Sequence, residues 1–141
     1  MSDIKAFLDT NLFVYLYSDM DASKRSRVIH VVNQYERFVN TQVLNEFCSV
    51  CIRKLKLPIV SVRNAVREIK DTCNLIVVDD ETVTTALDCH EKYGYAYYDS
   101  LMLASALESG CQYLLSEDMA DGQEIEGSLT IKSIFTEDCS L

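Results

Sequence analysis

The sequence predicts an α/β fold, a three-layer α/β/α sandwich with a central parallel sheet of four to five strands. Short apolar runs of strand length alternate with longer segments whose apolar residues recur at helical spacing, which is typical of a parallel sheet covered on both faces. One run, Leu75 to Val78, is apolar throughout and predicts a buried parallel strand. The 141 residues contain no internal repeat, low-complexity tract or linker. We therefore expect one domain over residues 1–141.

Each expected element has its own local signal. Ser23, Thr41 and Ser61 stand where helical patterns begin, and such residues favour helix N-termini. Gly94 and Gly110 each follow a helical pattern and are expected to end it. Strands are expected at residues 4–8, 37–40, 75–78, 113–115 and 129–131, and helices at residues 11–17, 23–35, 41–54, 61–69, 80–92 and 98–108.

The composition is that of an ordinary globular protein, with 48% apolar and 25% charged residues. No apolar run reaches the roughly 20 residues that span a bilayer. The N-terminus lacks the features of a signal peptide, so we expect a cytoplasmic protein with reduced thiols. Of the six cysteines, Cys48 and Cys51 alone have C-x-x-C spacing. They fall inside a helical pattern with no second pair, which favours a structural role over zinc binding or redox chemistry.

The charge is distributed unevenly along the chain. The net charge of −9 argues against a protein that coats nucleic acid through bulk electrostatics. Residues 1–70 carry 11 lysines and arginines against 7 acidic residues, whereas residues 71–141 carry 2 against 15. The basic residues form either a solvated helix face or a local strip that contacts phosphates beside an acidic site. The candidates for phosphate contact are Arg25, Arg27, Arg53 and Lys54.

Four acidic residues are expected to converge at one edge of the sheet. Asp9 follows the first predicted strand, Asp118 follows the fourth, and Asp99 lies in the first turn of an apolar helix. In parallel sheets, ligands bind beyond the carboxyl ends of the strands. Each acid alone has an ordinary alternative, since Asp9 or Asp99 can cap a helix and Asp118 can be a loop residue. For Glu46, which lies among apolar residues within a helix, the alternative is an ion pair with Arg53 or with another residue.

Clustered carboxylates need a counter-charge. They repel one another, and at least one keeps its proton near neutral pH unless a cation intervenes. Ligands that are all oxygen suit Mg²⁺ or Mn²⁺. Two such ions about 3.5–4 Å apart activate a water molecule and stabilise the leaving oxygen in phosphodiester cleavage. The pattern therefore predicts a phosphodiesterase whose metal ligands are Asp9, Glu46, Asp99 and Asp118.

These motifs resemble those of the PIN-domain ribonucleases, most closely the VapC-type toxins of toxin–antitoxin systems. The resemblance runs from FLDTN at residues 7–11 to SEDMADGQEIEGSLTI near the end, so it covers nearly the whole chain. The family has an Asp followed by Thr or Ser and Asn, a helical Glu, an Asp that opens an apolar helix, and a final Ser/Thr-x-Asp. Close members continue with Gly-Gln and then Gly, as Gly122-Gln123 and Gly127 do here. The four acids are matched in that order by Asp9, Glu46, Asp99 and Asp118.

The resemblance implies a PIN-like α/β/α fold and an endoribonuclease that depends on Mg²⁺ or Mn²⁺. It also implies a homodimer and a VapB-type antitoxin that holds the enzyme inactive by lying across the site. Asn11 and Ser116 would orient ligands or water, and Glu117 would stay outside the metal's ligands. The implied catalytic residues are Asp9, Asn11, Glu46, Asp99, Ser116 and Asp118.

Four tyrosines stand close to Asp99, at positions 93, 95, 97 and 98. They either stack on nucleobases or, as is more usual for tyrosine, pack the start of the helix or a dimer face.

Three other functions fit parts of the pattern. A PIN-like scaffold that only binds is disfavoured because it has no reason to keep four mutually repelling acids. A haloacid-dehalogenase-like phosphatase needs a second Asp two residues after the first, where this chain has Asn11. A thiol redox protein would depend on Cys48 and Cys51 and would tolerate the change Asp9→Asn.

Overall fold

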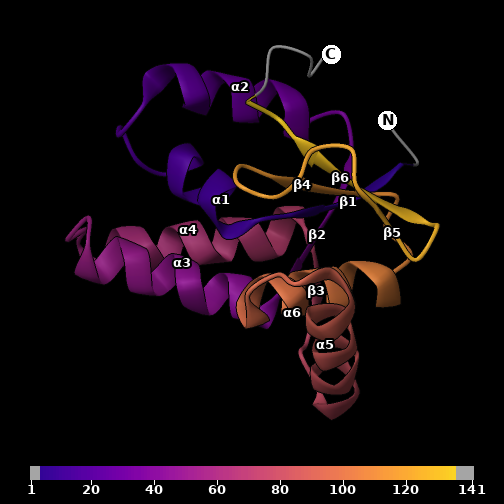
Figure 1. Ribbon diagram of the computed structural model, residues 1–141. Coiled ribbons are helices and arrows are strands. Elements are labelled where there is room, and N and C mark those ends of the chain that lie inside the picture. The colour runs from indigo at the N-terminus through magenta and orange to yellow at the C-terminus, as the bar shows by residue number, and fades with distance from the viewer. Residues whose placement is uncertain (1–3, 136–141) are drawn as a thin grey trace.

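The computed structural model describes residues 4–135, which are built around a six-stranded sheet (Figure 1). In spatial order the strands are β3 (Asn74–Ile76), β2 (Glu36–Asn40), β1 (Lys5–Leu8), β4 (Tyr113–Ser116), β6 (Leu129–Ser133) and β5 (Glu124–Ile125). All neighbouring strands in the sheet are parallel except β5 and β6. Phe7 of β1 lies between Phe38 of β2 and Leu114 of β4, so these three strands end at the same edge. The mostly parallel sheet confirms the predicted fold class.

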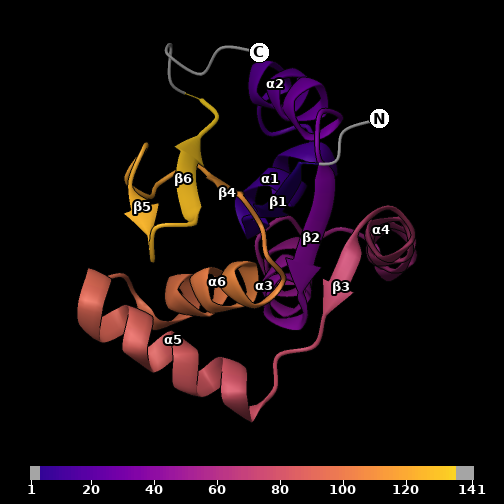
Figure 2. The ribbon, with the colours of Figure 1, turned by 90° about the vertical axis from the view of Figure 1, so that its right-hand side faces the viewer.

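Helices cover the sheet on both faces. They are α1 (Thr10–Leu16), α2 (Ala22–Val32), α3 (Thr41–Arg53), α4 (Ile59–Thr72), α5 (Asp80–Tyr93) and α6 (Tyr97–Glu108). The sheet separates α2, at the top of Figure 1, from α5 and α6 at the bottom. Helix α6 packs on β1, β2 and β4, and α5 lies on its outer side (Figure 2). Within the described range, no helix is both long enough and apolar enough to cross a membrane.

The core fixes the helices that carry acidic residues. Phe7, Leu8, Leu114 and Leu115 of the central strands are fully buried, because helices cover both faces of the sheet. Phe47 of α3 is also fully buried, directly after Glu46. Burying one such side chain stabilises the fold by about 1.5–3 kcal/mol. The position of Glu46 is therefore set by the packing of its neighbour.

Strand β3 differs from the buried strand that the apolar run at residues 75–78 predicts. It is parallel, as expected, but it lies at the edge of the sheet and pairs with β2 alone. Leu75 is 37% exposed and Val77, beyond the end of the strand, is 67% exposed. An apolar run alone does not distinguish a central strand from an edge strand. The prediction of a buried strand here is wrong.

Three helix starts also differ from the sequence-based expectation. Asp21, not Ser23, caps α2, because its side chain accepts a hydrogen bond from the Lys24 N–H at 3.0 Å. Asn40, not Thr41, caps α3 through the Val43 N–H at 2.8 Å. Helix α4 begins directly after Pro58, two residues before Ser61. The short strand β5 had no signal in the sequence.

Candidate active site

Asp9 stands where β1 ends and α1 begins. Its backbone is extended and occupies the N-cap position of α1, yet its side chain makes no capping hydrogen bond. Its N–H donates to the carbonyl of Leu115 in β4 at 3.1 Å, which holds the residue between the two strand ends. The residue is only 8% exposed. A buried carboxylate that caps nothing is unusual for a purely structural residue.

Glu46 lies on α3 and is half-buried. Its Oε2 is buried without a hydrogen-bond partner, and so is the hydroxyl oxygen of Thr10, the residue after Asp9. Among residues 4–135 the ion pairs are Lys24–Glu117 and Lys92–Glu126, so Glu46 does not form the alternative ion pair with Arg53. Buried oxygens without partners carry a desolvation cost of about 1–3 kcal/mol each, which a ligand at this point would offset.

Asp99 lies in the first turn of α6, also half-buried. The N-cap of this helix is Ala96, and no side chain caps it. The alternative role of Asp99 as the capping residue is therefore wrong. Its position still favours a negative charge, because the amino end of a helix carries partial positive charge.

Asp118 is exposed in the loop after β4. The loop turns at Ser116, which is fully buried and whose Oγ accepts a hydrogen bond from the Met119 N–H at 3.3 Å. Glu117 between them is held elsewhere: it accepts hydrogen bonds from Tyr15 at 2.8 Å and from Lys24 at 2.5 Å. Asp118, by contrast, acts through its charge on Asp9 and Asp99.

The electrostatics show that the four acids lie near one another. Burial raises the pKa of Asp9 to about 7, and the charge of Asp99 adds to the rise. The charges of Glu46 and Asp118 raise the pKa further, whereas a hydrogen bond with the Thr10 backbone lowers it. Burial, and then the charge of Asp99, also raise the pKa of Glu46. Burial and then Asp118 raise the pKa of Asp99. The charges of Glu46, Asp99 and Asp118 therefore all act on Asp9, at the carboxyl edge of the sheet.

The donor set suits a hard divalent cation. Within residues 4–135 no three or more histidine, cysteine, aspartate or glutamate side chains are arranged so that they hold a metal ion as they stand. The carboxylates repel one another, however, and the unpartnered oxygens of Thr10 and Glu46 point to a missing positive group. Carboxylate and hydroxyl oxygens are ligands that Mg²⁺ and Mn²⁺ accept. The residues present fit such an ion.

Asn40 was not among the predicted site residues, although it connects two of the acid-bearing helices. It is fully buried at the end of β2 and caps α3 with its Oδ1. Its Nδ2 donates to Ser105 Oγ of α6 at 2.9 Å. An Asn directly before a helical pattern is a recognisable cap, but nothing in the sequence indicates the bond to Ser105.

Two of the four tyrosines make hydrogen bonds across the fold: Tyr95, before α6, bonds to the loop after β4, and Tyr93, at the end of α5, bonds to the turn between β5 and β6. The Tyr95 hydroxyl donates to the Gln123 side chain and accepts from the Ala120 N–H at 3.2 Å. The Tyr93 hydroxyl donates to the Glu126 carboxylate at 2.6 Å and accepts from its N–H at 2.9 Å. The bonds of Tyr95 connect the segment before Asp99 to the loop that carries Asp118.

The basic candidates divide into two pairs. Arg25 Nε donates to the Leu16 carbonyl at 3.0 Å, and Arg27 Nε donates to the Ile134 carbonyl at 2.8 Å. Both therefore help to hold main chain in place. Arg53 and Lys54 are exposed at the end of α3 and, with Ser49 and Val50, line a hollow on the helix that carries Glu46.

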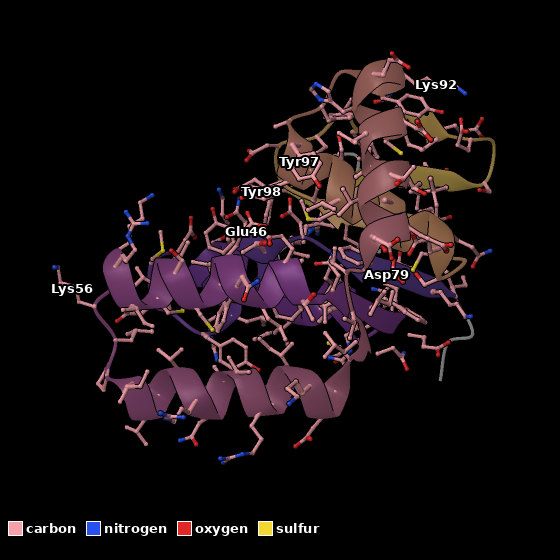
Figure 3. The ribbon with its side chains drawn as sticks, turned by 90° about the horizontal axis from the view of Figure 1, so that it is seen from below. Glu46, Lys56, Asp79, Lys92, Tyr97 and Tyr98 are labelled. Carbon is pink, nitrogen blue, oxygen red and sulfur yellow. The ribbon has the colours of Figure 1, made fainter. Side chains whose placement is uncertain are left out.

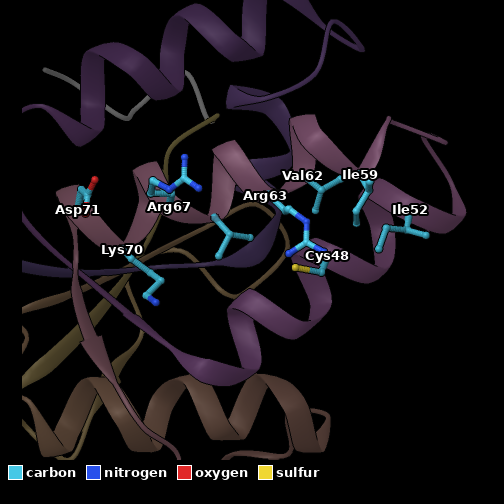
Figure 4. A pocket seen from close by; sticks show the side chains of 9 residues that line it. Cys48, Ile52, Ile59, Val62, Arg63, Arg67, Lys70 and Asp71 are labelled. Atoms are coloured by element: carbon cyan, nitrogen blue, oxygen red, sulfur yellow. The ribbon is translucent and has the colours of Figure 1, made fainter.

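A separate groove lies between α3 and α4 (Figure 4). Its volume is about 480 Å³. Ile52 and Ile59 on its wall are 48% and 56% exposed. Cys48 faces this groove, and burial raises the pKa of both Cys48 and Cys51, which keeps the thiols protonated and unreactive. The groove is lined by Cys48, Ile52, Ile59, Val62, Arg63, Val66, Arg67, Lys70 and Asp71.

The chain belongs to the PIN domain family, whose model matches residues 6–120. No curated protein sequence is similar enough to count as a match. Among solved structures, a toxin–antitoxin complex from Klebsiella pneumoniae has a TM-score of 0.69 and 17% identity, covering 92% of this chain and 98% of that one. VapC20 of Mycobacterium tuberculosis, a sarcin–ricin loop cleaving toxin, has a TM-score of 0.65 and 17% identity, covering 77% and 86%. VapBC2 of Rickettsia felis, bound to a promoter DNA fragment, has a TM-score of 0.64 and 15% identity, covering 92% and 100%.

Proposed function

We propose that this protein is a divalent-metal-dependent endoribonuclease that hydrolyses RNA phosphodiester bonds, and that it is the toxin of a toxin–antitoxin pair. The observation that carries the proposal is the convergence of Asp9, Glu46, Asp99 and Asp118 from four separate segments of the chain. Within residues 4–135 none of them forms an ion pair. Membership of the PIN domain family supports the same assignment.

The four acids would hold Mg²⁺ or Mn²⁺. When bound, such ions supply an activated water molecule and stabilise the charge on the leaving oxygen. Asp9 is the most buried of the four, and the charges of the other three all act on it, so its carboxylate is the proposed centre of the site. Its proton must leave before a cation is bound, which ties metal affinity to pH.

The other residues position these acids or the substrate. Ser116 shapes the loop that presents Asp118, and Asn11, the second residue of α1, would orient water or a ligand. Arg53 and Lys54 would contact RNA phosphates along the helix of Glu46. Arg25 and Arg27 are the weaker candidates, because each already holds a main-chain carbonyl.

We further propose a VapB-type antitoxin as partner and a homodimer as the assembly, in the cytoplasm. Two of the structurally similar proteins are described as toxin–antitoxin or VapBC assemblies, which supports an antitoxin. The groove between α3 and α4 offers an apolar wall of the kind that a helical antitoxin segment needs, with Arg63, Arg67 and Lys70 along it.

The alternative is a PIN-like scaffold that binds without catalysis. Incubation of a structured RNA mixture with Mn²⁺, Mg²⁺ or EDTA distinguishes the two functions. We expect metal-dependent cleavage by the wild type and by Asp88→Asn, an exposed acid of α5, and none by Asp9→Asn. Equal cleavage by Asp9→Asn would contradict the proposed site.

A further inference from the structure

Glu117 directly precedes Asp118 in the loop after β4, and residues of α1 and α2 bind its carboxylate. The Lys24 ammonium of α2 donates to Glu117 Oε2 at 2.5 Å. The Tyr15 hydroxyl of α1 lies 2.8 Å from the same oxygen and 3.0 Å from Oε1, so both oxygens face its hydrogen. Lys24 also donates to the Tyr15 hydroxyl at 3.2 Å. The three side chains therefore form one connected group.

Two aromatic rings enclose the Lys24 ammonium. Its Nζ lies 5.0 Å from the centroid of the Tyr15 ring and 5.1 Å from that of Phe135, which follows β6. The two rings meet edge to face, with centroids 5.5 Å apart and planes at 83°. The Lys24 side chain is 36% exposed and that of Glu117 is 17% exposed. Partial shielding and the two rings hold this pair more firmly than an exposed ion pair is held.

The place of Glu117 in the chain makes these contacts relevant to the acidic site. Burial, and then the charge of Asp118, raise the pKa of Asp99. Burial, and then the hydrogen bond to Glu117, raise the pKa of Tyr15 instead. Successive Cα atoms are only about 3.8 Å apart, so a Glu117 side chain without its partners is close enough to turn toward the other acids. A fifth carboxylate there would add to their repulsion and compete with Asp118 for a cation.

The other ion pair within residues 4–135 has the same residue types at a different place. Lys92 contacts Glu126 at 2.5 Å, and the Tyr93 hydroxyl donates to the same carboxylate at 2.6 Å. Figure 3 shows Lys92 at the end of α5, away from Glu46 of the acidic site. This second group therefore serves as a matched control for the first.

We propose that Lys24, together with Tyr15, is a positioning residue of the metal site. It holds Glu117 outside the set of metal ligands, so that Asp118 is the acid that this loop contributes. The inference rests on the proposed function, in which Asp118 is a metal ligand. Lys24 and Tyr15 act through Glu117 and contact neither the metal ion nor the RNA. Their role connects α1 and α2 to the loop of Asp118.

Mn²⁺ affinity tests this role without any RNA, through the loss of the free ion's electron paramagnetic resonance signal. Lys24→Met keeps an unbranched side chain between the two rings and removes the charge. We expect this variant to bind Mn²⁺ about fivefold more tightly, because the freed Glu117 brings an uncompensated negative charge to within several ångströms of a divalent ion. Cleavage of the RNA mixture is expected to fall about tenfold or more, since the competing carboxylate displaces Asp118.

The double variant Lys24→Met/Glu117→Gln removes both charges of the pair. We expect Mn²⁺ affinity and cleavage to return to within about twofold of the wild type, because no carboxylate is left to turn toward the site. Tyr15→Phe keeps the ring but loses one donor to Glu117, and should shift both properties in the same directions by less. Lys92→Met is expected to alter neither property. Melting temperatures in EDTA establish that each variant is folded.

Three results would overturn the role of Lys24. One is a folded Lys24→Met that binds Mn²⁺ and cuts RNA as the wild type does. Another is weaker Mn²⁺ binding together with slower cleavage, which would mean that the loop has merely loosened. The third is a loss of cleavage that Glu117→Gln does not restore. A wild type that binds no Mn²⁺ and cuts no RNA would instead overturn the proposed function, and this role with it.

Discussion

The side-chain amide of Asn40 donates a hydrogen bond of 2.9 Å to the hydroxyl of Ser105, and both residues are fully buried. The same Asn40 side chain caps α3 through the Val43 N–H. One residue therefore fixes the start of the helix that carries Glu46 against the helix that carries Asp99. The relative position of these two acids depends on a neutral residue at the end of β2.

Asn40→Ala should destabilise the protein by about 2–4 kcal/mol. Loss of an N-cap costs about 1 kcal/mol, and a buried partner left without its bond costs about 1–3 kcal/mol. Urea denaturation measures the change. Asn45→Ala, at an exposed position of α3, is the control and should stay within about 0.5 kcal/mol of the wild type. A loss below that figure for Asn40→Ala would show that the bridge is not needed.

The metal-free protein should lose stability as the pH rises from about 4 to about 7. Burial, and then the charge of Asp99, raise the pKa of Asp9 from 3.8 to about 7, so the folded state binds the proton more tightly than the unfolded state. The contribution is fully present below pH 3.8 and is lost as the pH passes 7. The difference corresponds to about 4 kcal/mol at most.

Urea unfolding in EDTA at several pH values tests this slope. Asp9→Asn removes the titrating group and should flatten the profile across the same range. A profile that falls equally steeply in Asp9→Asn would assign the slope to other groups.

Tyr95→Phe should destabilise the protein by about 1 kcal/mol, since the hydroxyl bonds to Gln123 and the Ala120 N–H are lost. It should also weaken metal binding, because the loop that carries Asp118 is less firmly held. Tyr97→Phe is the matched control, as its hydroxyl has no hydrogen bond within residues 4–135, and it should change neither property. Thermal unfolding and Mn²⁺ titration measure the two effects. Equal behaviour of both variants would mean that Tyr95 does not position the loop.

Metal-dependent cleavage should persist when both Cys48 and Cys51 are replaced by alanine. The two thiols lie on α3 with pKa values raised by burial, and neither is needed for metal chemistry. The RNA assay, with Asp9→Asn as the inactive reference, compares the variant with the wild type. Loss of cleavage in a folded double variant would favour thiol chemistry instead.

The fold class could be predicted from the sequence, and the four acids could be proposed as site residues, because both leave local patterns. Apolar runs mark the strands, and an acid directly after a strand, as at Asp9, marks the carboxyl edge of a parallel sheet. The family resemblance then supplied the order of the motifs. Its implication of a PIN-like fold is confirmed by the family match and by the structural comparisons.

Other features could not be predicted, because they depend on contacts between distant segments. The Asn40–Ser105 bond joins residues 65 positions apart, and the Tyr95–Gln123 bond joins residues 28 apart. The edge position of β3 depends on strand order, which an apolar run such as Leu75 to Val78 does not encode. Asp21 and Ser23 lie two residues apart, and Asp and Ser both favour the N-cap position, so the sequence alone does not decide which of them caps α2.

Binding of Mn²⁺ to the purified protein tests the central claim most directly, without any assumption about the RNA target. A thermal unfolding series over increasing Mn²⁺ should raise the melting temperature of the wild type and of the exposed-acid control Asp88→Asn. It should leave Asp9→Asn, Glu46→Gln and Asp99→Asn nearly unchanged. Stabilisation of those three variants equal to that of the wild type would contradict a metal site formed by the four acids.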